Sequence, residues 1–108
     1  MTLSITDRCG FILLPLENII YCKAKSCYTI FHLNNDKQIC STKTLGLYEK
    51  LLKNDSFIRV HNSTLINLNH FKYAIKKEVI VLSNGSKVTV SRRRKKIFKK
   101  KLEEFFEM

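Results

Sequence analysis

The sequence predicts a mostly β fold with one or two short helices, and three observations support that prediction. The first two thirds of the chain consist mainly of short apolar or alternating segments, which are typical of strands. Asn84-Gly85 lies between two such segments and is the strongest short hairpin signal. Helical spacing of apolar residues is found at residues 45–52 and 98–106. A chain of 108 residues is expected to form one domain, residues 1–108.

The predicted strands before the middle helix are recognised by alternation or by continuous apolar runs. They cover residues 3–6, 11–14, 19–22, 28–33 and 37–41. Pro15 ends the second of these strands because proline has no N–H to donate to a strand ladder. Asn34-Asn35-Asp36 is a strong turn signal between the last two. After the middle helix, residues 79–82 and 87–90 flank Asn84-Gly85, and the expected connection is a type I′ turn.

The middle helix is predicted from Leu45, Tyr48 and Leu52, which fall on one face at helical spacing. Its expected N-cap is Thr42 or Ser41, because a hydroxyl there accepts a hydrogen bond from the first turn.

The C-terminal helix is predicted from an apolar stripe made of Phe98, Leu102, Phe105 and Phe106, with a basic opposite side. We expect the stripe to pack on the domain's own core. The alternative is that it docks on a protein partner or on an anionic membrane.

The net charge of +11 exceeds what solubility requires. It indicates a polyanionic partner, either nucleic acid or an anionic membrane surface. Eight of the ten residues from Arg92 to Lys101 are Lys or Arg. Residues 1–10 do not have the basic and apolar regions of a signal peptide, and the apolar run at residues 11–16 is too short to span a bilayer. A cytoplasmic location with no membrane partner is therefore expected.

Ser91 is expected to start the C-terminal helix, and five cations follow it directly. A helix N-terminus carries free N–H donors and a partial positive charge, so cations there cost stability. This conflict predicts an anion site in which N–H donors, the helix dipole and guanidinium groups act together. The candidate ligands are Arg92, Arg93 and Lys95, and an arginine can pair with guanine or with phosphate through two N–H groups. The alternative is that these cations extend into water.

A second candidate site is the polar cluster at residues 61–64, which is set between apolar residues. Asn62 can bond adenine, while His61 and Ser63 are candidate phosphate or base ligands. For each residue taken alone, local satisfaction of the backbone is the favoured alternative. A third basic region contains Lys23, Lys25, Ser26 and Lys43, and it is either a phosphate contact or an ordinary solvated loop.

Catalytic and metal sites have little support in the sequence. The four cysteines contain no Cys-x-x-Cys pair, and Cys22 lies in an apolar run where a thiol acts as a small core residue. No phosphate loop, zinc-protease motif or nucleophile elbow is present. We therefore expect no enzyme activity, no metal, no cofactor and no small-molecule substrate.

The order of these segments resembles the LytTR family, a bacterial DNA-binding domain found in response regulators. The resemblance spans roughly residues 5–102 and rests on its most specific parts, which are Phe57-Ile58-Arg59-Val60-His61-Asn62-Ser63-Thr64-Leu65-Ile66-Asn67, Leu82-Ser83-Asn84-Gly85 and Val90-Ser91-Arg92-Arg93-Arg94. It implies an elongated sandwich of short antiparallel sheets, in which loops rather than a recognition helix enter successive major grooves. By the resemblance, Asn62 occupies a base-contacting position and Arg92 the basic position after the last strand. The third contacting loop is Lys25-Ser26-Cys27, in which the base-contacting residue is not assigned.

The function predicted from these features is sequence-specific binding of double-stranded DNA by a bacterial transcriptional regulator of a two-component system. The resemblance further implies promoter direct repeats and a possible homodimer on DNA. The alternatives are a basic protein-interaction module and a non-specific nucleic-acid binder. Most family members carry a receiver or membrane domain before this one, and this chain has neither. An excised domain and a stand-alone regulator are both compatible with that.

Overall fold

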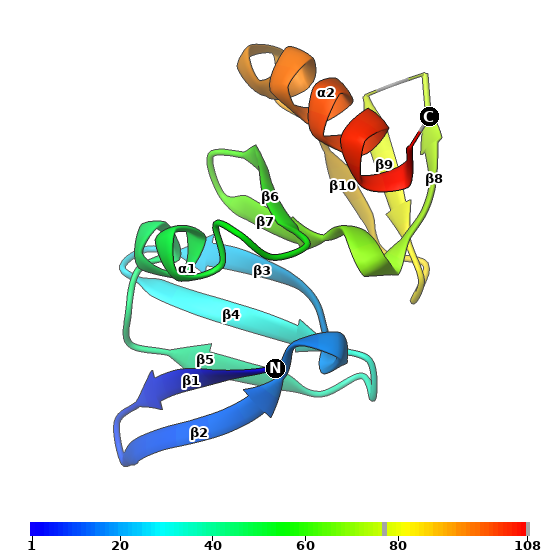
Figure 1. Ribbon diagram of the computed structural model, residues 1–108. Helices are drawn as coiled ribbons and strands as arrows, with labels where there is room; N and C mark the ends of the chain where they lie inside the picture. The colour runs from blue at the N-terminus through cyan, green and yellow to red at the C-terminus, as the bar shows by residue number, and fades with distance from the viewer. Residues whose placement is uncertain (77, 108) are drawn as a thin grey trace.

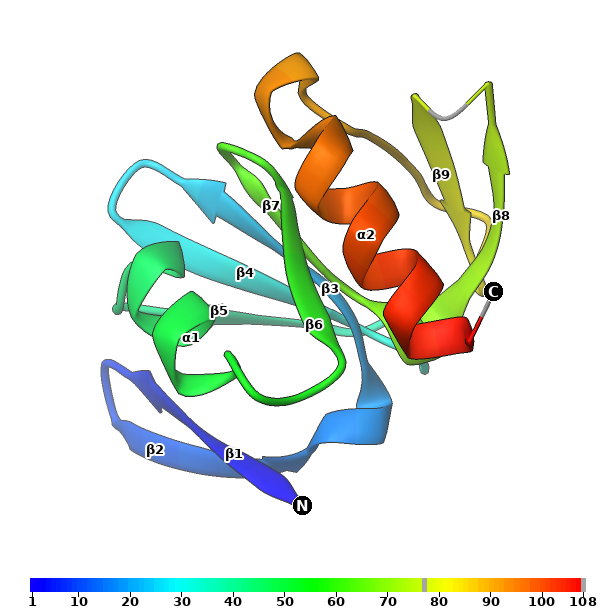
Figure 2. The same ribbon diagram turned by 45° about the horizontal axis from the view of Figure 1, so that its top comes forward.

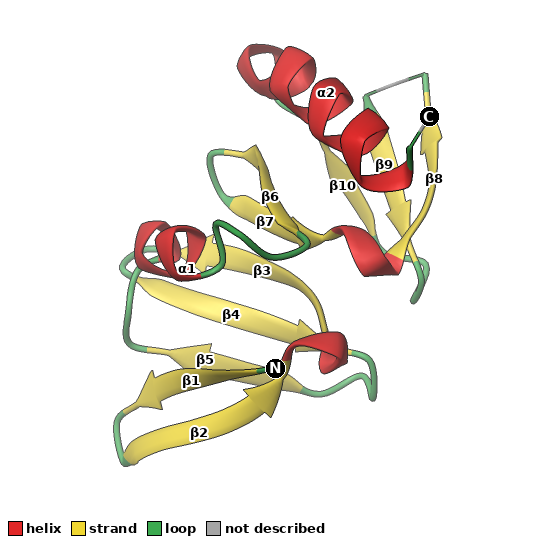
Figure 3. Cartoon of the chain, viewed as in Figure 1, coloured by secondary structure: helices red, strands yellow, loops and turns green. Residues whose placement is uncertain are grey.

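A computed structural model describes residues 1–76 and 78–107 and consists mainly of strands (Figures 1 and 3). The strands are β1 Thr2–Asp7, β2 Gly10–Pro15, β3 Ile19–Lys25, β4 Tyr28–Leu33, β5 Gln38–Ser41, β6 Phe57–His61, β7 Thr64–Asn67, β8 Phe71–Ile75, β9 Val79–Leu82 and β10 Lys87–Thr89. The helices are α1 Leu45–Leu51 and α2 Lys95–Phe106, with 3-10 turns η1 Leu16–Asn18, η2 Leu68–His70 and η3 Arg92–Arg94.

The strands form three antiparallel sheets that are stacked along the long axis of the molecule. The central sheet has the order β5-β4-β3-β7-β6, the hairpin β1-β2 lies on one side, and the sheet β10-β9-β8 lies on the other (Figure 1). The principal extents are 41 × 25 × 24 Å, so the molecule is elongated. The predicted elongated sandwich of short antiparallel sheets is therefore confirmed.

One face of the central sheet packs against β1, β2 and α1. The buried residues of this first core include Leu3, Ile5, Leu14, Cys22, Phe31, Leu45, Tyr48, Leu52 and Leu65. The ring of Tyr48 meets the ring of Phe31 edge-on, with centroids 4.8 Å apart, which is a favourable aromatic geometry. This packing holds α1 against the middle of the central sheet.

The opposite face of the sheet, on the side of β3, β7 and β6, packs against β9, β10 and α2. This second core contains Ile20, Ile58, Val60, Ile66, Leu68, Ile80, Leu82, Val88, Val90 and Phe98. The strands β6 and β7 therefore contribute side chains to both cores. The views agree that α2 lies along β6 (Figures 1 and 2).

The C-terminal stripe packs on the domain's own core, as predicted. Phe98 is buried, while Leu102 and Phe105 are partly buried against the second core. Phe106 is 42% exposed, and its ring lies 5.8 Å from that of Phe71. In the described part of the chain, no helix is long and apolar enough to cross a bilayer.

The predicted strands are confirmed, including the run at residues 11–14, although its Phe11 and Leu13 face solvent at 68% and 62% exposure. The prediction for the β9–β10 connection is wrong in its turn type. Asn84 is not among the residues with positive φ, whereas Gly85 has φ +85°. The Gly85 N–H donates to the Leu82 carbonyl at 2.8 Å. The connection is thus the three-residue kind, in which a tight turn is followed by a glycine with positive φ.

The predicted cap of α1 is also wrong, because the N-cap is Thr44. The Thr44 hydroxyl accepts a hydrogen bond from the Leu47 N–H at 3.4 Å. Ser41 is instead the last residue of β5, and its buried hydroxyl donates to the Thr6 carbonyl at 2.8 Å. Ser41 therefore belongs to the strand, and α1 begins only after Thr44.

Candidate nucleic-acid interface

Three polar segments from distant parts of the chain lie along one edge of the sandwich (Figures 1 and 2). They are the β3–β4 turn at residues 25–27, the β6–β7 turn at residues 61–63, and the segment at residues 91–95 after β10. Strand register brings the first two together, because the Ala24 N–H donates to the Ser63 carbonyl at 2.8 Å. The third is joined to them where the Ser91 N–H donates to the Val60 carbonyl at 2.8 Å. Figure 2 shows the three connections following one edge of the molecule, up to the start of α2.

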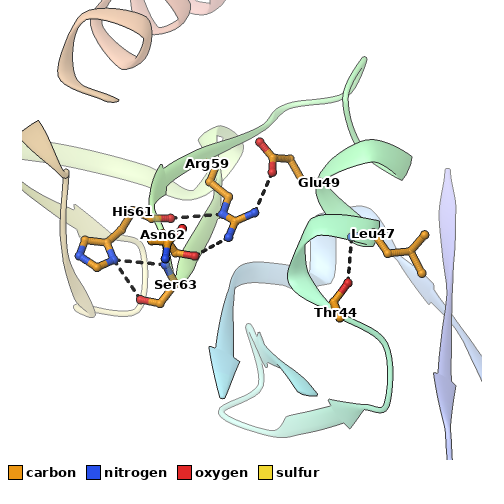
Figure 4. A network of polar contacts seen from close by, with 7 residues as sticks. All are labelled: Thr44, Leu47, Glu49, Arg59, His61, Asn62 and Ser63. Carbon is orange, nitrogen blue, oxygen red and sulfur yellow. Dashed lines mark hydrogen bonds and ion pairs between the residues drawn. The ribbon is translucent and has the colours of Figure 1, made fainter. Parts of the chain in front are cut away.

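A β-bulge at Val60 gives the β6–β7 turn two different sides. Arg59 pairs with Leu65, but His61 pairs with Thr64, so β6 has one more residue than β7 here. In a regular strand, Arg59 and His61 would lie on the same face. The extra residue turns them to opposite faces, as bulges do when they redirect a side chain. Figure 4 shows Arg59 toward α1 and His61 away from it.

Arg59 fixes the backbone of the turn from the α1 side. Its Nη1 donates to Glu49 Oε1 at 2.8 Å, its Nε donates to the His61 carbonyl at 3.3 Å, and its Nη2 donates to the Asn62 carbonyl (Figure 4). The Arg59 side chain is only 14% exposed, whereas that of Glu49 is 43% exposed. Because Asn62 is held through its backbone oxygen, its side chain stays exposed in front of a fixed turn.

His61 and Ser63 brace the same turn from the other side. The Ser63 N–H donates to His61 Nδ1 at 3.2 Å, and the Ser63 hydroxyl lies 3.0 Å from the same nitrogen. Since a backbone N–H can only donate, Nδ1 must be unprotonated, which leaves the proton of a neutral ring on Nε2. His61 and Ser63 therefore satisfy the local backbone, which is the alternative given for them from the sequence. The side chain of Asn62 is exposed and makes no such bond within the cluster.

The arginine segment starts with a 3-10 turn rather than directly with an α-helix. Ser91 is the N-cap of η3 and its hydroxyl makes no cap bond, so the prediction that the α-helix starts at Ser91 is wrong by about one turn. The Arg94 N–H donates to the Ser91 carbonyl at 3.0 Å, and α2 begins only at Lys95. Arg92 and Arg93 are exposed.

Lys95 differs from the arginines before it because it has a carboxylate partner. Its Nζ lies 3.0 Å from Glu78 Oε1, and the two side chains are 39% and 60% exposed. An exposed pair of this kind contributes little to stability. It does offset one positive charge, so Arg92 and Arg93 are the stronger candidates for an anion.

The β3–β4 turn presents Lys25, Ser26 and Cys27 to solvent. Ser26 has φ +58°, which is the left-handed conformation of a tight turn. The Thr29 hydroxyl donates to the Lys43 carbonyl at 2.8 Å, which holds Lys43 near the start of β4. The structure thus brings Lys25 and Lys43 to the same end, as the sequence suggested.

Arg59 and Glu49 are functional candidates that the sequence analysis missed. The available signal was an arginine between two buried apolar residues, Ile58 and Val60, where a strand facing two cores has no room for an unpartnered charge. The partner lies ten residues earlier on α1 and could not be identified without the fold.

The cysteines have different environments. Cys22 is fully buried, and this burial raises the pKa of its thiol. Cys9, Cys27 and Cys40 are exposed and free. Within residues 1–76 and 78–107, no three His, Cys, Asp or Glu side chains are grouped so as to hold a metal ion.

Comparisons with known proteins agree on one family. The model of the LytTr DNA-binding domain matches residues 10–103. The transcriptional regulatory protein LytR of Staphylococcus aureus (strain N315) is 35% identical over 91 residues, which cover 81% of this chain and 37% of that protein. The sensory transduction protein LytR of Staphylococcus haemolyticus (strain JCSC1435) is 32% identical over 103 residues, covering 80% of this chain and 39% of that protein.

A solved structure shows the same fold. The LytTr DNA-binding domain of a putative methyl-accepting/DNA response regulator from Bacillus cereus superposes with a TM-score of 0.78 and 28% identity. The match covers 94% of this chain and 95% of that one. The chain spans less than two fifths of the length of the curated relatives named above.

Proposed function

The chain belongs to the LytTr DNA-binding domain family, and from that premise we propose that it binds duplex DNA with sequence specificity as part of a bacterial transcriptional regulator. The proposal includes a cytoplasmic location and one DNA-binding unit over residues 1–108. It assigns the domain no catalytic step. It also includes binding of two copies to direct repeats, as membership of the family implies.

The observation that carries the proposal is the placement of three polar segments along one edge of the fold (Figure 2). The segments at residues 25–27, 61–63 and 91–94 contain no carboxylate. Each presents at least one exposed polar or basic side chain, and hydrogen bonds between strands link the segments to one another. Segments without a carboxylate of their own suit a polyanion, and a fixed turn suits contacts with base edges.

The proposed roles differ between the segments. Asn62, on its fixed turn, would bond the N6 and N7 edge of an adenine in the major groove. Arg92 would bond a guanine or a phosphate, with Arg93 on the backbone beside it. Lys25 and Ser26 would contact the neighbouring groove or its phosphates, so that the edge as a whole follows the duplex.

Fluorescence anisotropy on two duplexes tests this proposal. One duplex is a randomised pool, and the other is a sequence selected from it by repeated binding. We expect the selected duplex to bind at least about a hundredfold tighter, since specific binding exceeds non-specific binding by about 10³ or more in typical regulators. Equal binding to both, lost at high salt, would mean that the positive charge acts alone and that the domain is a non-specific binder.

A further inference from the structure

A small polar hollow lies beside the β6–β7 turn, on the side opposite to Arg59. Its volume is about 160 Å³. The polar residues that line it are Lys23, His61, Ser63, Thr64, Lys87 and Thr89. We call it the β10 hollow, because Lys87 and Thr89 belong to that strand. Neither residue lies in the three segments described above.

The fold builds this hollow from strands that are far apart in sequence. Lys23 on β3 pairs with Thr64 on β7, which places both at the end of the central sheet. The bulge at Val60 turns His61 to the same side as Thr64. Lys87 and Thr89 are exposed on either side of the buried Val88, at the edge of the other sheet. The hollow is thus the junction between two sheets.

The lining has the chemistry of a phosphate site. It combines two ammonium groups, an imidazole and three hydroxyls, and it contains no carboxylate. Lysine binds phosphate as a point charge, and a hydroxyl such as that of Thr89 can donate to a phosphate oxygen, whereas the Ser63 hydroxyl already contacts His61 Nδ1. The His61 Nε2 carries the ring proton because Nδ1 accepts from Ser63, so the imidazole is also a donor.

We propose that the β10 hollow binds a phosphate of the DNA backbone next to the bases contacted by the β6–β7 turn, with Lys87 and Lys23 as its charged ligands. The inference rests on the proposed DNA-binding function and extends the interface to a strand edge outside the three segments. Because His61 and Ser63 belong both to the turn and to the hollow, a phosphate held there would set the distance between Asn62 and the base edges.

Lysine variants test the charge. Lys87→Gln and Lys23→Gln should each weaken binding to the selected duplex and to the pool equally, roughly three- to tenfold at 0.15 M salt, and lower the salt slope by about 1. The control is Lys37→Gln, which removes the same charge at the opposite end of β4, after the turn at residues 34–36. Lys37→Gln should change neither quantity, and Lys87→Arg should retain the affinity of the parent protein.

A modified duplex identifies the phosphate. Single neutral methylphosphonate linkages are placed in turn along the selected sequence. At one position the neutral linkage should weaken binding by the parent protein. The Lys87→Gln variant should lose no further affinity when the linkage is neutral at that same position. Inorganic phosphate is then titrated while the amide NMR signals of Thr64 and Thr89 are followed. Shifts there, combined with unchanged DNA binding by Lys87→Gln, would assign the hollow to free phosphate and overturn the DNA-backbone proposal.

The outcomes separate this inference from the proposed function. If Lys87→Gln binds as tightly as the parent protein while Arg92→Ala binds more weakly, the hollow is not a backbone contact, although the DNA-binding proposal stands. If the parent protein itself does not distinguish the selected duplex from the pool, the proposed sequence-specific function fails first. Melting temperatures of all variants show whether any loss of binding reflects unfolding.

Discussion

The β6–β7 turn and the arginine segment after β10 lie next to each other but are held in opposite ways. In the turn, Arg59 and His61 fix the backbone from two sides and leave Asn62 exposed. In the arginine segment, Ser91 makes no side-chain cap bond, and Arg92 and Arg93 extend from a short 3-10 turn. A fixed polar group suits discrimination between bases, whereas exposed cations suit a charged backbone of any sequence.

The largest effect is expected from Phe98→Ala, because Phe98 anchors α2, and with it the arginine segment, to the second core. Removing a buried aromatic side chain costs about 3–5 kcal/mol of unfolding free energy. Urea denaturation should show this loss. Ile97→Ala is the matched control, since Ile97 is 65% exposed on the same helix and should cost far less. Equal losses for the two variants would mean that α2 is not held through Phe98.

The variant Arg59→Lys should loosen the β6–β7 turn without changing the arginine segment, so it tests the role of the fixed turn separately. A lysine keeps the charge near Glu49, but its three N–H groups share one nitrogen and cannot reproduce the separate positions of Nε, Nη1 and Nη2. We expect the preference for the selected duplex over the pool to fall by about 1 kcal/mol, the usual contribution of one hydrogen bond. Pool binding should hold, since no charge is lost.

The control for Arg59→Lys is Glu49→Gln, which keeps an acceptor for Nη1 and should change selectivity less. Binding to the two duplexes is compared by anisotropy, and thermal melting checks the fold. If Arg59→Lys lowers binding to both duplexes by the same factor, the turn is not what provides selectivity.

Lys99→Gln should give a smaller and sequence-independent effect. Lys99 is exposed on α2, beyond the arginine segment. Removing its charge should weaken binding to both duplexes by the same factor, about threefold or less, and should slightly lower the salt slope. A change in the ratio between the two duplexes would show that α2 itself takes part in base contacts.

The smallest effect concerns pH and lies outside both regions. The pKa of His32 is lowered by burial and by the nearby charge of Lys23, and its ring stacks on Tyr21 with centroids 4.2 Å apart. The folded protein thus resists protonation of His32, so it loses stability as the pH falls below about 6.5, the ordinary value, toward the lowered one. His32→Gln should lose less stability than the parent protein between pH 7.5 and 5 in urea titrations. An identical loss in both proteins would contradict the assignment.

The strands could be predicted because alternation and apolar runs survive in the fold, as in residues 28–33 of β4. The turn type at Asn84 could not be predicted, because the sequence Asn84-Gly85 suits both a two-residue and a three-residue hairpin loop, which differ by one residue in length. The N-cap of α1 could not be predicted either, because the hydroxyl of the expected cap Ser41 donates to the carbonyl of Thr6, 35 positions earlier in the chain.

The exposed positions of Asn62 and Arg92 could be predicted, because each lies in a polar segment next to apolar strand residues. Their contact with DNA stays a prediction. The site could not be predicted where the pairing of strands decides which face a side chain occupies. The bulge at Val60 leaves no mark in the alternation, yet it separates Arg59 from His61. Lys87 resembles an ordinary hairpin residue until the junction of the two sheets places it beside His61 and Ser63.

The most direct test compares Asn62→Ala with Arg92→Ala on the selected duplex and the pool across a salt series. The account predicts that Asn62→Ala costs about 1–3 kcal/mol on the selected duplex, little on the pool, and leaves the salt slope unchanged. For Arg92→Ala we expect a lower salt slope and weaker binding to both duplexes. Loss of selectivity in Arg92→Ala with full selectivity in Asn62→Ala would contradict the division of roles between the fixed turn and the arginine segment.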